Sequence, residues 1–164
     1  MSQASMIEPP MIVATESLTM AKIRAKIPRA RIQAEMGPLV QELIGAITRQ
    51  NVAITGPWFT HHFHRPAEFF DFEVCMPVAS IVRAEGRMQP GEWPAMNVVR
   101  TLYRGPYQGL PGAWGELMAW IEARGVEITS ELWERYLVNP QSDANPDHWL
   151  TELNLPLRRE TAVV

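Results

Sequence analysis

The chain has 164 residues, of which 46% are hydrophobic and 20% charged, and its formal net charge at pH 7 is −3. This length and composition suit a single globular domain covering residues 1–164. The slightly acidic balance and the absence of a basic block argue against direct nucleic-acid binding. No apolar stretch approaches the ~20 residues needed to cross a bilayer. No signal peptide is evident, so we expect a cytoplasmic protein without a membrane partner.

Taken in chain order, the first half predicts two strands, one helix and two further strands. The first strands are expected at residues 11–14 and 23–27, and Pro28 should end the second. Apolar residues at helical spacing predict a helix over residues 39–47, beginning after Gly37 and Pro38. Strands are then expected at residues 58–64 and 70–78.

The second half repeats this order. A strand is predicted at residues 97–103, and a helical stripe runs from Ala113 to Ile121 before Gly125 ends the helix. Two more strands are expected at residues 132–138 and 149–155. The loop between them is rich in Pro, Asn, Asp and Ser.

The two halves can be aligned with each other. Residues 51–55 match residues 125–129, the helical stripes match at the same offset, and residues 72–77 match residues 151–156 at a slightly larger one. This shared order predicts a duplicated β-α-β-β unit, with repeats at about residues 7–80 and 93–157. We therefore expect an α+β fold with pseudo-two-fold symmetry. It would have one antiparallel sheet, two main helices and a central ligand groove.

These segments resemble the GyrI-like small-molecule-binding domain, a fold that also serves as the effector-binding domain of multidrug-sensing and AraC-type regulators. The resemblance is carried by residues 103–110, 120–125, 133–137 and 151–156. It implies a protein that captures hydrophobic, aromatic or cationic small molecules in a groove with an acidic floor. The chain begins almost directly with its first predicted strand, so we expect the stand-alone form of the domain.

The strand at residues 132–138 carries the main candidate site residues, because Glu134 and Tyr136 share one of its faces. The resemblance implies that Glu134 faces the groove, where desolvation would raise its pKa and its charge would attract a cation. The alternative is a solvent-facing Glu134 paired with an arginine. Tyr136 either stacks on a planar ligand or is a half-buried sheet residue. The other candidate ligand contacts are Trp58, Thr60, His62, Trp93, Tyr103 and Tyr107.

In the alignment of the repeats, Thr60 and His62 occupy the positions of Glu134 and Tyr136. The predicted groove therefore has one acidic half and one imidazole half. Several other conspicuous residues are given structural roles instead. Trp114 and Trp120 are expected in the core, Glu152 at the surface rim, and Asp71 and Glu73 in solvent.

His61, His62 and His64 could indicate a metal. His62 and His64 project to one face of a predicted strand, a geometry that can bind zinc. A third ligand is not evident, because the only cysteine, Cys75, lies in an apolar run where a buried, unreactive thiol is expected. The sequence therefore predicts neither a metal nor a cofactor, and the lone cysteine excludes an intrachain disulfide.

Three functions follow from the resemblance. The first is binding of a hydrophobic or cationic small molecule. The second is hydrolysis that opens the strained ring of a cyclopropanoid DNA-alkylating compound, with Glu134 as general base and Tyr136 orienting or protonating the substrate oxygen. The third is inhibition of a topoisomerase through protein contacts.

Overall fold

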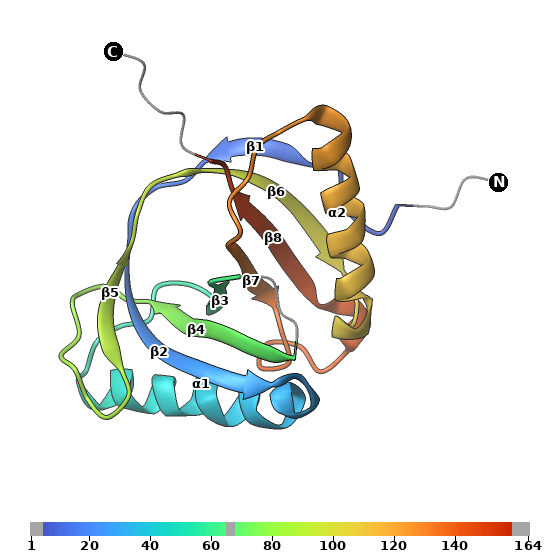
Figure 1. The fold of residues 1–164 in the computed structure, drawn as a ribbon. Coiled ribbons are helices and arrows are strands. Elements are labelled where there is room, and N and C mark those ends of the chain that lie inside the picture. The colour runs from blue at the N-terminus through green and yellow to red at the C-terminus, as the bar shows by residue number, and fades with distance from the viewer. Residues whose placement is uncertain (1–4, 65–67, 159–164) are drawn as a thin grey trace, which may run out of the picture.

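The computed structural model describes residues 5–64 and 68–158, so the ends of the predicted 1–164 domain lie outside the described residues. Within this part, eight strands form one antiparallel sheet in the order β1-β6-β8-β7-β3-β4-β2-β5. The strands are β1 (Met11–Ala14), β2 (Leu18–Pro28), β3 (Phe59–His62), β4 (Phe69–Pro77), β5 (Gln89–Trp93), β6 (Asn97–Arg104), β7 (Leu132–Val138) and β8 (Leu150–Pro156). The two main helices are α1 (Ile32–Arg49) and α2 (Leu110–Arg124) (Figure 1).

The register of the two central strands locates the pseudo-two-fold axis. Strands β3 and β7 pair antiparallel, with Thr60 directly opposite Glu134. These two residues are equivalent in the sequence repeat, so the axis passes between them. On either side, β4 and β2 repeat the arrangement of β8 and β6. This confirms the predicted α+β fold, with its duplicated units, antiparallel sheet and two main helices.

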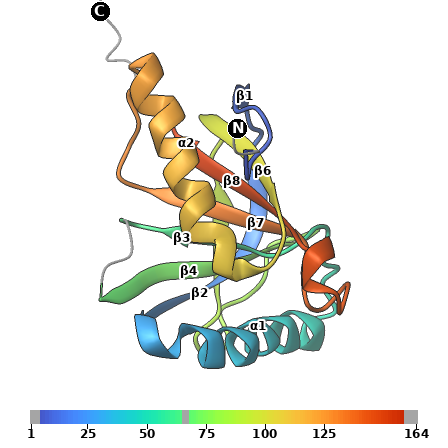
Figure 2. The same cartoon turned by 90° about the vertical axis from the view of Figure 1, so that its right-hand side faces the viewer.

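Both helices cover the same face of the sheet, one over each half. Val74 on β4 lies opposite Thr60, and Leu153 on β8 lies opposite Glu134. Cross-strand partners share a face of the sheet, and Val74 packs in the α1 core whereas Leu153 packs in the α2 core. The two views show α1 and α2 diverging over the strands between them (Figures 1 and 2).

The opposite face of the sheet carries a third apolar cluster, to which neither main helix contributes. Its members include Phe59, Trp93 and Trp133, whose rings meet edge-on or tilted at centroid distances of 5.0 to 5.7 Å. Cys75 is fully buried in this cluster, and burial raises the pKa of its thiol. Burial with a raised pKa agrees with the expected unreactive thiol.

Two carboxylates on this face are buried, so the expectation that Glu73 is solvated and Glu152 lies at a rim was wrong. Glu73 pairs with Lys22 at 3.0 Å and lies 3.5 Å from His61. Glu152 pairs with Arg100 and with Arg135, each at 3.2 Å. Asp71, by contrast, is half-buried and pairs with Arg24 at 3.1 Å.

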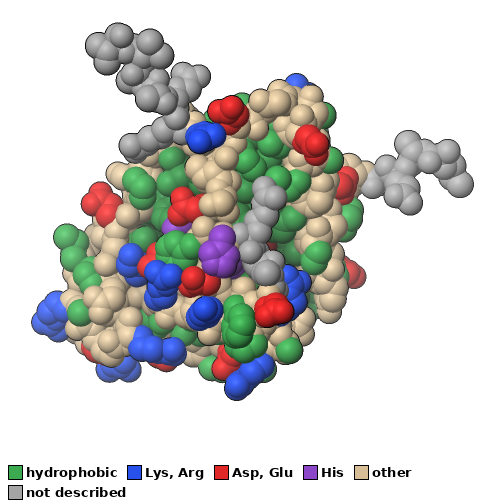
Figure 3. All heavy atoms as spheres, viewed as in Figure 1, with side chains coloured by type: hydrophobic (Ala, Val, Ile, Leu, Met, Phe, Trp, Pro, Cys, Tyr) green, Lys and Arg blue, Asp and Glu red, His purple; other side chains and the backbone are tan. Residues whose placement is uncertain are grey.

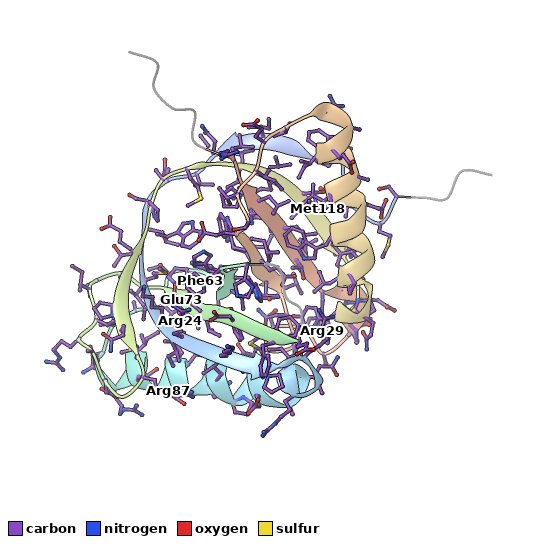
Figure 4. All side chains as sticks on the ribbon, viewed as in Figure 1. Arg24, Arg29, Phe63, Glu73, Arg87 and Met118 are labelled. Atoms are coloured by element: carbon purple, nitrogen blue, oxygen red, sulfur yellow. The ribbon has the colours of Figure 1, made fainter. Side chains whose placement is uncertain are left out.

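Glu73 and Glu152 are buried because the chain packs around the third cluster on this face. Strand alternation alone does not reveal that packing. Arg24 and Glu73 are cross-strand partners on β2 and β4 and lie close together in Figure 4. On the face shown in Figure 3, basic and acidic side chains are interspersed rather than gathered by sign.

Two elements differ from the sequence-based expectation. Helix α1 begins at Ile32 rather than after Pro38, which lies inside the helix and removes one backbone donor. Ile32 and Met36 pack against the α1 core and extend its apolar stripe towards the N-terminus. Strand β5 was not predicted because Pro90 and Gly91 are typical of turns. It is an edge strand, where a missing N–H is tolerated.

Candidate functional site

A groove of about 740 Å³ opens between the N-terminal halves of α1 and α2, above the central strands. Its lining is mostly apolar and aromatic, and its size suits a drug-sized molecule. Met118 is on the α2 side, and Arg29 precedes α1 (Figure 4). The principal lining residues are Ile32, Met36, Val40, Trp58, His62, Phe70, Tyr107, Leu110, Trp114, Met118, Leu132, Glu134, Tyr136 and Trp149.

Glu134 is one of the residues that line this groove and is only 9% exposed. The Tyr136 hydroxyl donates to its Oε1 at 3.2 Å, and the Trp114 indole N–H donates to its Oε2 at 3.3 Å. Burial raises the pKa of Glu134, and these two hydrogen bonds offset part of that rise. The carboxyl group is therefore held on both oxygens by neutral donors.

His62, on the neighbouring strand β3, lies close to Glu134 but does not neutralise its charge. Its Nε2 is 3.9 Å from Glu134 Oε1, and its ring stacks on Phe72 at a centroid distance of 5.3 Å. Burial, together with the charges of His61 and His64, lowers the pKa of His62 to about 4. The imidazole is therefore neutral at pH 7.

Thr60 and Trp58 hold Tyr136 in place. Thr60 is fully buried beneath the groove, and its Oγ1 hydrogen-bonds with the Tyr136 hydroxyl at 2.9 Å. The Trp58 ring packs on the Tyr136 ring at a centroid distance of 4.2 Å. Burial and the nearby charge of Glu134 raise the pKa of Tyr136, so the phenol stays protonated and can donate.

Tyr107 and Trp149 form an aromatic pair at one end of the groove. Their rings stack at a centroid distance of 4.7 Å, and Tyr107 meets Tyr136 edge-on at 5.8 Å. Burial first, and then the charge of Glu134, raise the pKa of Tyr107. Aromatic faces around a buried carboxylate form a site that can attract a cation through both the charge and the rings.

The structure places the sequence-predicted candidates in three locations. Trp58, His62, Tyr107, Glu134 and Tyr136 line the groove, and Thr60 lies beneath it. Tyr103 packs in the α2 core and donates to the Pro106 carbonyl at 2.6 Å. Trp93 lies in the cluster on the opposite face of the sheet.

Sequence reasoning missed three aromatic residues of the groove, Phe70, Trp114 and Trp149. Trp114 was expected in the core, but it is half-buried and donates to Glu134. The sequence offers one indication that Trp114 contacts the groove: it lies at the N-terminal end of the apolar stripe of α2, where the helix borders the groove. Trp149 follows an irregular loop, and nothing in the sequence indicates that it stacks on Tyr107.

Within residues 5–64 and 68–158, no group of three or more His, Cys, Asp or Glu side chains is arranged to hold a metal ion. His61, on the opposite face from His62, instead lies 2.8 Å from Glu131 and 3.5 Å from Glu73. The described helices include none that is long and apolar enough to cross a membrane.

Several solved structures share this fold. EcmrR, in the EcmrR-DNA complex in EcmrR-RPo, is 21% identical to this chain with a TM-score of 0.82. The match covers 94% of this chain and 59% of the EcmrR chain. The EcmrR C-terminal domain is 22% identical with a TM-score of 0.81, covering 93% and 98%. SAV2435, bound to tetraphenylphosphonium, is 9% identical with a TM-score of 0.61, covering 92% and 94%. A hydrolase from Listeria innocua is 13% identical with a TM-score of 0.67, covering 91% of both chains.

At these identities the likeness shows the fold alone, and the chain spans 59% of the length of EcmrR in that complex. No curated protein matches the chain. The model of the GyrI-like small molecule binding domain matches residues 8–158. This chain therefore belongs to the GyrI-like small molecule binding domain family.

Proposed function

We propose that this protein captures hydrophobic, aromatic compounds that carry a positive charge, and that Glu134 receives the charge. The observation that carries this proposal is the buried carboxylate of Glu134, held by Tyr136 and Trp114, which are both neutral donors. A buried carboxylate is costly unless a partner compensates it. A ligand cation would supply that partner, and the aromatic walls would bury the apolar body of the ligand.

The fold comparison supports the same ligand class. SAV2435 is bound to tetraphenylphosphonium, a lipophilic cation surrounded by aromatic rings. In the present chain, the rings of Trp58, Tyr107 and Trp149 offer comparable aromatic surface around the groove. The neutral His62 adds a polar wall without competing with the ligand for Glu134.

Thermal unfolding in the presence of planar cationic dyes tests this function. A ligand at a hundred times its Kd stabilises the folded state by about 2.7 kcal/mol, which for a chain of this size raises Tm by roughly 5–10 °C. We expect this shift for wild type, and at least about tenfold weaker cation binding for Glu134→Gln. Glu73→Gln is the matched control, because it removes a buried carboxylate from the opposite face. Equal cation affinity in wild type and Glu134→Gln would refute the role of Glu134.

A hydrolase is the second candidate, favoured by the 3.2 Å hydrogen bond between Tyr136 and Glu134 and by the fold of the Listeria innocua hydrolase. In this alternative, Glu134 takes a proton from water as the water oxygen attacks a strained cyclopropane carbon. The breaking C–C bond sends its electrons to the conjugated carbonyl oxygen, which Tyr136 protonates or hydrogen-bonds. A raised pKa makes Glu134 a stronger base than an ordinary carboxylate.

Mass spectrometry separates the two candidates. Turnover gives a product heavier by one water, absent with Glu134→Gln and strongly reduced with Tyr136→Phe. Binding alone gives a Tm shift with the compound recovered unchanged, which would exclude hydrolysis of that compound.

A further inference from the structure

Some residues that line the groove carry buried hydrogen-bonding groups without a partner in the described part of the chain. Among the described residues, six buried side-chain N or O atoms have no hydrogen-bond partner, and half of them belong to residues that line the groove. These are Trp58 Nε1, His62 Nδ1 and Tyr107 Oη. Leaving a buried polar atom unpaired destabilises the folded state, so such atoms call for an explanation. A ligand that reaches them would supply their missing partners.

Tyr107 is the clearest of the three. Trp149 stacks on one side of its ring and Tyr136 meets its edge, so the position of the phenol is fixed by packing. Burial, together with the charge of Glu134, raises the pKa of the Tyr107 hydroxyl. The oxygen therefore keeps its proton. A protonated phenol donates a hydrogen bond. The donor therefore lies in the electrostatic range of the same carboxylate that would receive a ligand cation.

Trp58 adds a second donor, since an indole N–H can only donate. Its ring packs on Tyr136, next to the floor of the groove. His62 directs Nε2 towards Glu134 at 3.9 Å, so its unpartnered Nδ1 is the nitrogen remote from the carboxylate. The polar groups of the residues that line the groove therefore include one carboxylate, Glu134, and two neutral donors, Tyr107 Oη and Trp58 Nε1, for which no acceptor is found among the described residues. Arg29 and three glutamines also line the groove.

We propose that the groove selects aromatic cations that also carry a hydrogen-bond-accepting oxygen, such as a carbonyl, and that this oxygen accepts from Tyr107 or Trp58. The inference rests on the proposed binding function and narrows its ligand class. A lipophilic cation without oxygen satisfies Glu134 but leaves both donors unpaired. An oxygenated cation of the same shape satisfies both kinds of group and binds more tightly.

The test uses pairs of permanent cations that differ by one carbonyl oxygen. The 2-, 3- and 4-acetylbenzyl triphenylphosphonium ions are compared with the corresponding ethylbenzyl ions by isothermal titration calorimetry. For at least one isomer, we expect wild type to bind the acetyl compound about fivefold more tightly, which is about 1 kcal/mol. If Tyr107 donates to the acetyl oxygen, Tyr107→Phe should abolish this preference. If Trp58 is the donor, Trp58→Phe should abolish it. Trp133→Phe, which removes an unpartnered indole N–H from the opposite face, should retain it.

The unfolding temperature without ligand provides an independent readout. Because the Tyr107 hydroxyl has no hydrogen-bond partner among the described residues, Tyr107→Phe should leave Tm unchanged or raised, whereas loss of a structural hydrogen bond would lower it. Equal binding of every acetyl and ethyl pair overturns the selectivity while leaving the cation site in place. A preference that survives in both Tyr107→Phe and Trp58→Phe also overturns it. Failure of both compound classes to bind overturns the proposed function as well.

Discussion

Replacing Glu134 with glutamine should stabilise the protein at neutral pH, although it removes the residue that we propose binds the ligand. Burial raises the pKa of Glu134 above its ordinary value of 4.5, so folding favours the protonated carboxyl. Its contribution to stability is therefore complete below pH 4.5 and is lost as pH rises through the folded-state pKa. Above that range, the wild-type protein holds a buried charge that Glu134→Gln lacks.

The size of the effect follows from the partners of the side chain. In Glu134→Gln, the amide oxygen can still accept from Trp114, while the amide nitrogen can donate to Tyr136, whose hydroxyl can then donate to Thr60. No hydrogen bond need be lost, so the gain is the relief of the buried charge, about 1–2 kcal/mol. This corresponds to a Tm increase of roughly 2–8 °C.

Differential scanning calorimetry at pH 7.5 and pH 4 measures this difference. The gain should be present at pH 7.5 and shrink at pH 4, where the wild-type carboxyl is largely protonated. Glu73→Gln should behave in the opposite way. Burial raises the pKa of Glu73, but hydrogen bonds from His61 and Lys22 outweigh this and lower the pKa overall, so its charge stabilises the fold above pH 4.5. A lower Tm for Glu134→Gln at pH 7.5, or an equal gain at both pH values, would refute the reasoning.

Three further outcomes are expected. Cation affinity should fall as pH drops below the raised pKa of Glu134, because the protonated carboxyl must lose its proton before it can pair with a cation. Titration calorimetry in two buffers of different ionisation enthalpy would detect the protons released on binding in that pH range. Thr60→Val should destabilise the fold by about 1 kcal/mol in urea unfolding, because a buried hydroxyl bonded to Tyr136 is lost; an unchanged midpoint would contradict this. Glu152→Gln should destabilise by about 1–2 kcal/mol, since Arg100 and Arg135 lose a buried partner but remain partly solvated; equal stability at neutral pH would contradict it.

The sequence predicted most of the elements and the equivalence of Thr60 with Glu134, because both depend on local periodicity and on the internal repeat. That these two residues are cross-strand partners at the axis was not predicted and comes from the structure. The sequence did not indicate which strand residues are buried on the face of the sheet that neither main helix covers. Glu73 and Glu152 look like solvent-facing strand residues, and only the packing of distant strands around the third cluster buries them.

The composition of the groove was harder to predict than its location. The repeat made His62 equivalent to Tyr136, and the register of β3 and β7 in the structure places the two on either side of the axis. Tyr107 and Trp149 come from irregular segments whose path depends on the whole fold. Trp93 was considered a candidate because it flanks the start of the second repeat, but it ends strand β5, which was not predicted, and packs on the opposite face of the sheet.

Under the proposed function, the difference between the repeats at the axis would suit the groove to a single cation. A symmetric floor would place two carboxylates on cross-strand partners, with Cβ atoms about 4.5–5.5 Å apart. Like charges at that distance repel each other and raise the pKa of one of the two carboxyl groups. In this chain the partner of Glu134 is Thr60, whose hydroxyl instead holds Tyr136 against the carboxylate. The duplicated backbone thus brings one carboxylate, that of Glu134, to the axis, with the neutral Thr60 as its cross-strand partner.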